Sequence, residues 1–460
     1  MSSQLPLLII QPRRLGDLIL TFPLVADLSL RYPGQPIWIA GEKAFFQELL
    51  PFAPRAAFFP AAQLQLLARR EYQTVINLGS DAAAAACAGQ CQAQLKLGRA
   101  LTDGKLRING FWQLYRESLT HNNYHNLFHW ADLFRLDLGP QPTKLARPEP
   151  KAAASGRIGL FIGASETSKR PQPQFWAALA NQLALAGLKP VLLGGPGEAD
   201  LAAAIMAKKP AAINFCGKTS LGQLAAIMAT LDLMVTPDTG PMHLADWLGV
   251  PVLNLSMGNV SAYETGPLSP GQHVVTAAIS CYGCWGCRQK ALLCHNEFKA
   301  AKIARIAENL ARGQKPEQSA GLTLYQTGRD RNNLYCLRGG DARSAASQLS
   351  RFWQAAFLVF DHATSDRLAA FRQQAQQLCA SHEQLVGHIQ ANFGKMLVAL
   401  ARASKNRSAL PASFWTSQPR HSRLFAGNLH MGLQNEAYAP AAFRQALERM
   451  ELLQEALTES

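Results

Sequence analysis

The stretch from Leu231 to Gly258 restricts the possible folds of this chain more than any other part of the sequence. It begins with an apolar run, Leu231 to Thr236, whose length and composition predict a buried strand. Turn and cap residues follow from Pro237 to Pro241, and proline suits the first position of a helix because it has no N–H to leave unpaired. Apolar residues then recur at helical spacing, and Pro251 to Leu255 predicts a second strand. The pattern therefore predicts strand, tight loop, helix and strand, which is the unit of a parallel α/β sheet.

The loop inside this unit has the residues of a phosphate site. The first N–H groups of a helix have no partner within the helix, so the backbone at Gly240 offers donors to an anion. Thr239 adds a hydroxyl, and His243, one turn into the helix, adds a ring N–H. Asp238 completes an Asp-Thr-Gly tripeptide, but an aspartic protease needs two such carboxylates close together, in a β-rich chain. An ordinary helix capped by Thr239 is the alternative interpretation.

The first part of the chain also alternates strands with helices. Strands are predicted at residues 7–10, 36–40 and 74–78. Helical stretches lie between them, which indicates a parallel sheet covered by helices on both faces. Ligands of such sheets bind at the carboxyl ends of the strands, where Arg13, Arg14 and Asp17 follow the first strand. Asp17 has two interpretations, as a first-turn acid that favours the helix dipole or as a general base in a cleft.

A stretch rich in Pro, Gly and Lys, residues 136–157, has the composition of a linker and leads into a second series of the same kind. Its other strands are predicted at residues 157–162, 190–193 and 212–215. The loops after the first two carry Lys169, which either faces solvent or binds a phosphate, and Glu198, which either begins a helix or binds a ribose diol. Neither loop has the GxGxxG dinucleotide fingerprint or the pattern of a P-loop.

The formal net charge of +14 indicates an anionic partner, which could be a nucleic acid, an acidic membrane surface or a phosphorylated substrate. No helix-turn-helix, RNA-recognition or zinc-finger motif supports a nucleic acid. The sequence shows neither a secretory signal nor an apolar run long enough to span a membrane. We therefore expect a cytoplasmic location, with peripheral binding to the inner membrane as an option.

The cysteines form two groups. Four of them, with the spacing C-x2-C-x2-C-x6-C, are Cys281, Cys284, Cys287 and Cys294. In a reducing compartment this spacing is typical of a zinc or iron–sulfur ligand set, and free thiols in a compact loop are the alternative interpretation. Cys87 and Cys91 lie in an Ala-rich helical stretch and are expected in the core.

These motifs together resemble glycosyltransferase family 9, the heptosyltransferase family. The signature Asp-Thr-Gly-Pro-Met-His-Leu-Ala is present unbroken from Asp238 to Ala245. The matching N-terminal motifs are Arg14-Leu15-Gly16-Asp17 and Arg31-Tyr32-Pro33. Those of the second half are Gly163-Ala164-Ser165 with Lys169 and Trp176, and Gly217 with Thr219-Ser220-Leu221. The resemblance extends over residues 5–312, approximately.

The resemblance implies an inverting transfer of a heptose, or a related sugar, from a nucleotide-sugar, usually ADP-heptose, to a lipopolysaccharide-type glycolipid. It implies that catalysis needs no metal or other cofactor, in agreement with the lack of an Asp-x-Asp pair in the sequence. Asp17 matches the catalytic base, and Arg13 and Arg14 are assigned to the anionic acceptor. The residues assigned to the donor nucleotide and its diphosphate are Lys169, Glu198, Asp238, Thr239, Gly240 and His243. A protein that binds the nucleotide-sugar without turnover, or that uses another donor and acceptor, is the alternative.

The sequence therefore predicts an α/β chain with the GT-B architecture, two Rossmann-like domains followed by a C-terminal helical extension. The acceptor domain is placed at residues 1–145, the nucleotide-sugar domain at 155–315 and the extension at 318–460. Within the extension, a connector is predicted from Gly321 to Asp341, before an apolar stripe from Leu349 to Phe360 at helical spacing. Further helices are predicted at residues 367–378, 383–403 and 440–457. Because the family motifs end earlier, we expect a chain that stops near Gln318 to keep a folded two-domain core.

Overall fold

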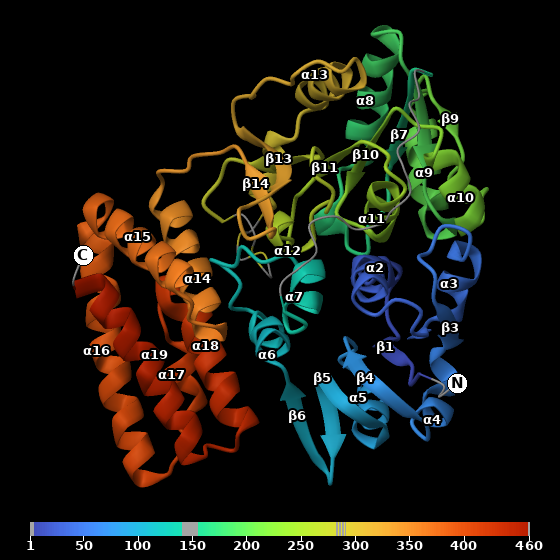
Figure 1. The fold of residues 1–460 in the computed structure, drawn as a ribbon. Coiled ribbons are helices and arrows are strands. Elements are labelled where there is room, and N and C mark those ends of the chain that lie inside the picture. Colours follow the sequence, from blue (N-terminus) through green and yellow to red (C-terminus); the bar gives the residue numbers. More distant parts are fainter. Residues whose placement is uncertain are drawn as a thin grey trace.

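A computed structural model of the chain describes residues 4–139, 155–281 and 291–458, together with Cys284, Cys287 and Gln289. Most of the predicted linker lies outside these ranges. Two twisted sheets with their helices form the larger part of the molecule, and a group of C-terminal helices lies beside them (Figure 1). The GT-B-like arrangement with a helical extension, as expected from the sequence, is confirmed. No helix in the described ranges is long and apolar enough to cross a membrane.

The first sheet has six strands among the described residues, in the order β3-β2-β1-β4-β5-β6. Its strands are β1 (Leu7–Gln11), β2 (Ile37–Gly41), β3 (Ala57–Pro60), β4 (Glu71–Asn77), β5 (Gln92–Thr102) and β6 (Lys105–Asn109). All neighbours are parallel except the β5–β6 hairpin, which the sequence analysis did not predict. Strand β1 is buried along its whole length, so its carboxyl end, where Arg13 follows, lies at the centre of the sheet edge.

Helices cover both faces of this sheet and continue beyond it. They are α1 (Leu15–Leu20), α2 (Phe22–Arg31), α3 (Lys43–Leu49), α4 (Leu64–Leu67), α5 (Ala82–Gln90), α6 (Phe111–Ser118) and α7 (Trp130–Leu136). A short 3₁₀ turn, η1 (Ala61–Gln63), precedes α4. Cys87 lies in α5 and Cys91 directly follows it, and both thiols are buried in the core as predicted.

The second sheet has eight strands in the described part of the chain, in the order β14-β13-β12-β11-β10-β7-β8-β9. The strands are β7 (Arg157–Phe161), β8 (Lys189–Leu193), β9 (Ile213–Asn214), β10 (Leu233–Pro237), β11 (Val252–Leu255), β12 (His273–Ala277), β13 (Leu322–Arg329) and β14 (Tyr335–Arg338). The accompanying helices are α8 (Pro173–Leu185), α9 (Ala199–Met206), α10 (Leu221–Met228), α11 (Gly240–Trp247), α12 (Ala262–Thr265) and α13 (Ala300–Ala311). The 3₁₀ turns are η2 (Thr167–Lys169), η3 (Pro196–Glu198) and η4 (Leu293–Glu297).

The prediction of a connector from Gly321 to Asp341 was wrong, because this stretch forms β13 and β14 and pairs with β12 in antiparallel register. The apolar alternation of β13 is confined to its first four residues, Leu322 to Tyr325, and gives way to the polar and glycine residues from Gln326 to Arg329. β13 is held in place by its pairing with β12. The hydroxyl of Thr327 also donates a hydrogen bond to the backbone oxygen of Ser269, just before β12. The division into three domains remains a prediction.

The two sheets share one hydrophobic core at their junction. The edge-on contact of Phe22 and Trp247, with ring centroids 5.3 Å apart, joins α2 to α11. The indole N–H of Trp247 donates to the backbone oxygen of Phe52 at 2.8 Å. Residues of both halves therefore belong to one continuous cluster of buried apolar side chains. Packing across the junction, and not the linker alone, holds the two sheets together.

The C-terminal extension consists of helices packed lengthwise against one another (Figure 1). They are α14 (Ala345–Asp361), α15 (Ser365–Ser381), α16 (Glu383–Asn406), α17 (Ala412–Thr416), α18 (Arg420–Asn435) and α19 (Pro440–Thr458). The predicted stripe lies in α14, where Trp353 is fully buried and stacks on Phe425 of α18 at 5.5 Å.

The core of the extension also includes side chains from α6 and the loop after it. Tyr115 lies against Phe357 with ring centroids 4.5 Å apart, and Trp112 and Phe128 belong to the same cluster. The premise for an independent core ending near Gln318 was therefore wrong. Removal of the extension would expose aromatic side chains of α6 and the loop after it, which the extension covers, and would delete two strands of the second sheet.

A buried carboxylate ties the same regions together. Asp132 of α7 forms ion pairs with Arg135 at 2.8 Å and with Arg329 of β13 at 2.7 Å. It also accepts a hydrogen bond from the backbone N–H of Tyr335 in β14 at 2.7 Å. These partners hold the pKa of Asp132 below its usual value although burial alone would raise it. A buried charge that lost such partners would be strongly destabilising.

We therefore expect a chain that ends at Gln318 to be insoluble, or to unfold without a cooperative thermal transition. The reason is the exposure of Trp112, Tyr115 and Phe128 and the loss of the partners of Asp132. The full-length protein, prepared in the same way, is the control. A soluble truncated chain with a sharp melting transition that ADP shifts upward would contradict this expectation.

Candidate active site

The N-termini of α1 and α11 meet at two glycines. A Cβ added to Gly16 would lie 3.2 Å from the Cα of Gly240 and 3.3 Å from Cδ2 of His243. A Cβ added to Gly240 would lie 3.0 Å from the backbone N of Gly16. Neither position has room for a larger residue unless the helices separate. This contact brings the loop after β1 and the loop after β10, one from each sheet, to a single place.

Thr239 occupies the N-cap position of α11, but its hydroxyl makes no capping bond. No hydrogen bond involving this hydroxyl is formed with any residue that the structure describes. The alternative of an ordinary capped helix therefore has no support in the geometry. The candidate donors for an anion at this helix N-terminus are therefore the Thr239 hydroxyl and the N–H of Gly240, because Pro241 has no N–H and the N–H of Met242 bonds the backbone oxygen of Thr239.

Asp238, directly before Thr239, is a buried acid. Burial raises its pKa to about 6, although a hydrogen bond from Thr265 and the charge of Lys169 oppose this. The hydroxyl of Thr265 donates to Oδ2 of Asp238 at 2.5 Å. The nearby charge of Asp17 also raises the pKa of Asp238. Asp17, Lys169 and Asp238, which are far apart in the sequence, are thus neighbours in space.

His243 lies one turn into α11, is only 7% exposed and contacts the α1 side of the junction. Burial, and then the nearby His129, lower its pKa to about 3. The imidazole is therefore neutral at any working pH and offers one N–H donor rather than a positive charge. Positive charge for a diphosphate at this helix has to come from other residues.

Lys169 is the nearest candidate for that charge and lies in a loop that several contacts hold in place. Its ammonium group is 3.3 Å from the carboxylate of Glu166, which also accepts a hydrogen bond from Asn259. His295 bonds the backbone oxygen of Ser168 at 2.7 Å. The loop passes so close to Gly258 that a Cβ there would lie 2.2 Å from the same oxygen, at a backbone φ of +77°. The side chain of Lys169 is thereby kept beside Asp238.

Glu198 closes the 3₁₀ turn η3 at the carboxyl end of β8. Its carboxylate accepts a hydrogen bond from the backbone N–H of Gly195 at 2.8 Å. The same carboxyl group fills the space beside Gly163, where a Cβ would lie 2.6 Å from it. Glu198 is also the N-cap residue of α9, so it does begin a helix. This helix starts at the carboxyl end of β8, the edge of the sheet where ligands of such folds bind. Both interpretations of this residue stand.

Asp17 lies in the first turn of α1 but does not cap it, because the N-cap residue is Arg14. Burial raises the pKa of Asp17, and the positive charges of Arg14, Arg116 and Arg13 act against this. Arg13 and Arg14 are exposed, whereas Arg116 reaches the group from α6. A half-buried carboxylate among three guanidinium groups is the environment expected of a base beside an anionic substrate.

Three residues of the site were missed by the sequence analysis. They are Arg116, His129 and Glu264. Glu264 in α12 is buried, accepts a hydrogen bond from Asn126 at 3.4 Å and has its pKa raised to about 7 by burial. No local pattern distinguishes Glu264 from a surface acid, and only the packing of α12 reveals it. Arg116 and His129 reach the site from helices after the first sheet.

The four clustered cysteines lie in a loop that is described only in part. Burial raises the pKa of the Cys284 thiol, and Cys281, Cys287 and Cys294 add to the effect, so the four are neighbours. In the described ranges, no set of three or more His, Cys, Asp or Glu side chains is arranged to hold a metal ion. The interpretation of this cluster as a zinc or iron–sulfur ligand set stays a prediction, and no catalytic step is assigned to it.

The sequence profile of glycosyltransferase family 9 (heptosyltransferase) matches residues 61–295, just over half of the 460-residue chain. Among curated proteins, the lipopolysaccharide core heptosyltransferase OpsX of Haemophilus influenzae is 48% identical over 42 residues, 9% of this chain and 12% of that protein. The lipooligosaccharide heptosyltransferase 2 of Campylobacter jejuni is 27% identical over 181 residues, 37% of this chain and 56% of that protein. The matched segments thus span less than two thirds of either relative.

Two solved structures are similar along most of their length. The ADP-heptose lipopolysaccharide heptosyltransferase II of E. coli gives a TM-score of 0.51 at 19% identity, over 67% of this chain and 99% of that chain. A family 9 glycosyltransferase of Veillonella parvula gives a TM-score of 0.50 at 19% identity, over 68% and 99%. At such identities the similarity shows the fold, which is the two-domain fold that the sequence predicted.

We expect Lys169→Ala and His243→Ala each to weaken the binding of ADP. A charge-assisted hydrogen bond to phosphate is worth about 1.5–3 kcal/mol, and a neutral donor somewhat less. Calorimetric titration measures the change, with Lys218→Ala, an exposed lysine of the same domain, as the control. If both variants bind ADP as tightly as the wild type, the diphosphate site lies elsewhere.

We also expect Glu264→Gln to stabilise the protein above neutral pH. Because burial raises the pKa of Glu264 from 4.5 to about 7, folding becomes less favourable as the pH rises through that window and the acid ionises. Glutamine removes this cost, about 3 kcal/mol by linkage, and still accepts the bond from Asn126. Thermal melts at pH 5 and pH 8 should show the stabilisation only at pH 8. An equal effect at both pH values would refute the buried-acid assignment.

Proposed function

The chain belongs to glycosyltransferase family 9 (heptosyltransferase), and we propose that it is an enzyme that transfers a heptose or a related sugar. The proposed donor is a nucleotide-sugar, ADP-heptose, and the proposed acceptor is an anionic glycolipid of the lipopolysaccharide type. The Haemophilus and Campylobacter relatives, both heptosyltransferases of lipopolysaccharide or lipooligosaccharide, support this choice.

One observation carries the proposal, the glycine contact between the two helix N-termini. It sets the carboxylate of Asp17 from one sheet opposite the anion-binding loop, residues 238–243, of the other. A glycosyl transfer needs those two functions at a single carbon atom, a base for the attacking hydroxyl and donors for the departing diphosphate. Either feature alone would be compatible with a simple binding site.

In the proposed reaction, Asp17 accepts the proton of an acceptor hydroxyl as its oxygen attacks the anomeric carbon of the donor. The bond from that carbon to the diphosphate oxygen breaks on the opposite side, so the configuration inverts. Lys169, the N–H of Gly240 and the Thr239 hydroxyl stabilise the negative charge that develops on the diphosphate. His243 contributes a neutral donor, and Glu198 binds the ribose of the nucleotide. Neither a metal ion nor another cofactor is assigned a step.

The arginines around Asp17 have two roles in this proposal. Arg13 and Arg14 are exposed at the entrance and bind the negative charge of the acceptor. With Arg116, they also oppose the rise in the pKa of Asp17 that burial causes, which favours the ionised form that accepts a proton. The net charge of +14 is consistent with an anionic glycolipid at the inner-membrane surface as the partner.

We expect Asp17→Asn to lower turnover by about 10²-fold or more, which is the usual contribution of a general base. ADP should bind the variant almost normally, because asparagine keeps the shape of the side chain and the diphosphate donors are untouched. Turnover is measured with purified protein, an ADP-sugar panel and a glycolipid acceptor. Asp200→Asn, which changes an exposed first-turn acid of α9, is the matched control.

Near-normal turnover of Asp17→Asn would refute its role as the base. If the wild-type protein binds ADP but transfers no sugar from any donor in the panel, the alternative of a binding protein without turnover gains support. The turnover of the wild-type protein distinguishes these two outcomes, because the first requires an active wild type and the second an inactive one.

A further inference from the structure

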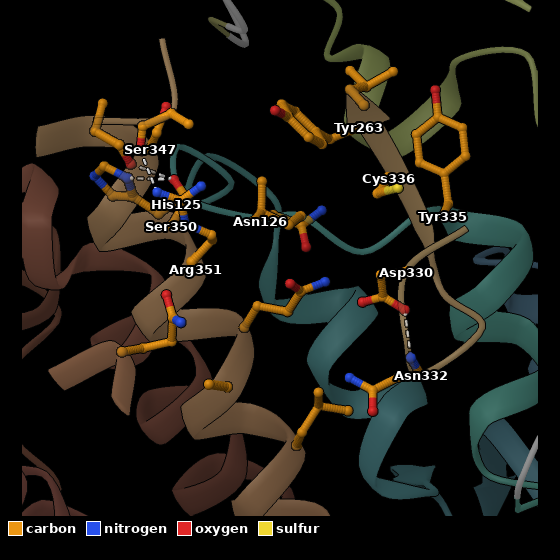
Figure 2. Close-up of a pocket in the computed structure, with 18 of the residues that line it drawn as sticks. His125, Asn126, Tyr263, Asp330, Asn332, Tyr335, Cys336, Ser347, Ser350 and Arg351 are labelled. Carbon is orange, nitrogen blue, oxygen red and sulfur yellow. Dashed lines mark hydrogen bonds between the residues drawn. The ribbon is translucent and has the colours of Figure 1, made fainter. Parts of the chain in front are cut away.

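A cavity of about 1340 Å³ lies between the helical extension and the rest of the molecule. Its walls come from the loop after α6, from α12 with the β13–β14 hairpin, and from α14 and α15 (Figure 2). The figure shows His125, Ser350 and Arg351 on one side and Tyr263, Asp330 and Cys336 on the other. A volume above the usual range of about 300–1,000 Å³ for small-ligand sites can hold more than one sugar ring.

The cavity carries an excess of positive charge. Five arginines and two aspartates line it, which gives a formal charge of +3. Four of the arginines make no ion pair with a carboxylate in the described part of the chain, and only Arg367 is paired, with Asp361 at 3.2 Å. The four are Arg331, Arg338, Arg351 and Arg420. His125 adds no charge, because burial lowers its pKa to about 4. A concave surface with uncompensated guanidinium groups attracts an anion.

The remaining lining is suited to hydroxyl groups. Amide and hydroxyl side chains, including Ser347 and Gln354, line the cavity together with the rings of Tyr263 and Tyr325. Planar rings next to hydrogen-bonding side chains complement a saccharide, which has apolar C–H faces and polar edges. Arg420 lies 4.2 Å from the centroid of the Tyr124 ring, so its guanidinium group is held in place by a cation–π contact.

The cavity adjoins the candidate active site through the single turn of α12. Ser261 and Tyr263 at its start line the cavity, whereas Thr265 at its end bonds Asp238 of the diphosphate loop. Between them, the carboxylate of Glu264 accepts a hydrogen bond from the side chain of Asn126, which lines the cavity. A ligand in the cavity would therefore lie one short helix away from the site of sugar transfer.

We propose that this cavity binds an anionic saccharide, a sugar that carries a phosphate or carboxylate group, as the part of the acceptor beyond the reacting hydroxyl. The inference rests on the proposed function, since it assigns the cavity to the acceptor of that reaction. It gives the helical extension a role, because α14, α15 and Arg420 supply much of the lining. Arg331 and Arg420, both exposed, bind the anionic group.

The test is calorimetric titration of the full-length protein with glucose 6-phosphate, glucuronate, glucose and inorganic phosphate. ADP is present at saturation, so that the diphosphate site is filled and the titrations report on the cavity. Binding of ADP itself is measured first and reports on the proposed donor site alone. The double variant Arg331→Gln/Arg420→Gln is compared with Arg402→Gln, which changes an exposed arginine of α16 outside the cavity. Melting temperatures confirm that the variants are folded.

We expect glucose 6-phosphate or glucuronate to bind the wild type and Arg402→Gln equally, and the double variant at least tenfold more weakly. Glucose should bind far more weakly than either anionic sugar. Equal binding to the double variant, or no binding of either anionic sugar at millimolar concentration, would overturn the inference. Inorganic phosphate binding as tightly as glucose 6-phosphate would also overturn it, because the cavity would then recognise an anion and not a saccharide.

Discussion

The contact between Gly16 and Gly240 is the constraint on which the site depends. Each glycine is close enough to the other helix that one added carbon atom would meet the backbone at 3.0–3.2 Å. As a result, the N-termini of α1 and α11, each the positive end of a helix dipole, lie next to each other. Asp17 and the diphosphate loop are functional neighbours only at this separation. The continuous core around Phe22 and Trp247 holds the helices there.

The helical extension is bound to this arrangement by packing rather than by a linker. Trp112, Tyr115 and Phe128 from the first half complete the core of the extension, and the extension in turn encloses the cavity next to α12. The chain therefore combines the two-sheet fold of its family with C-terminal helices that form one side of this cavity. The family resemblance accounts for the sheets and the diphosphate loop, and the extension distinguishes this chain from that pattern.

The sequence predicted those parts of the fold whose signal is local. Continuous apolar runs marked eight strands correctly, and the loop from Asp238 to His243 could be singled out as a candidate phosphate site because its residues are contiguous. The β5–β6 and β13–β14 hairpins were missed because their partly exposed strands are stabilised by pairing and lack a strong apolar pattern. Arg116 and Glu264 were missed for a related reason. Their environment is created by helices that meet only in the folded chain, and no residue near them in the sequence indicates it.

The buried carboxylate of Asp132 affects the folding of the chain during synthesis as well as the stability of the folded protein. Its partners Arg329 and Tyr335 follow it by 197 and 203 residues, so they leave the ribosome long after α7. At about 5–20 residues per second, translation of that interval takes roughly 10–40 s. During this time Asp132 of α7 lacks its partner Arg329, and the apolar side chains of α6 and α7 are not yet covered by the extension. The packing around Asp132 can therefore be completed only after β13 and β14 have been synthesised.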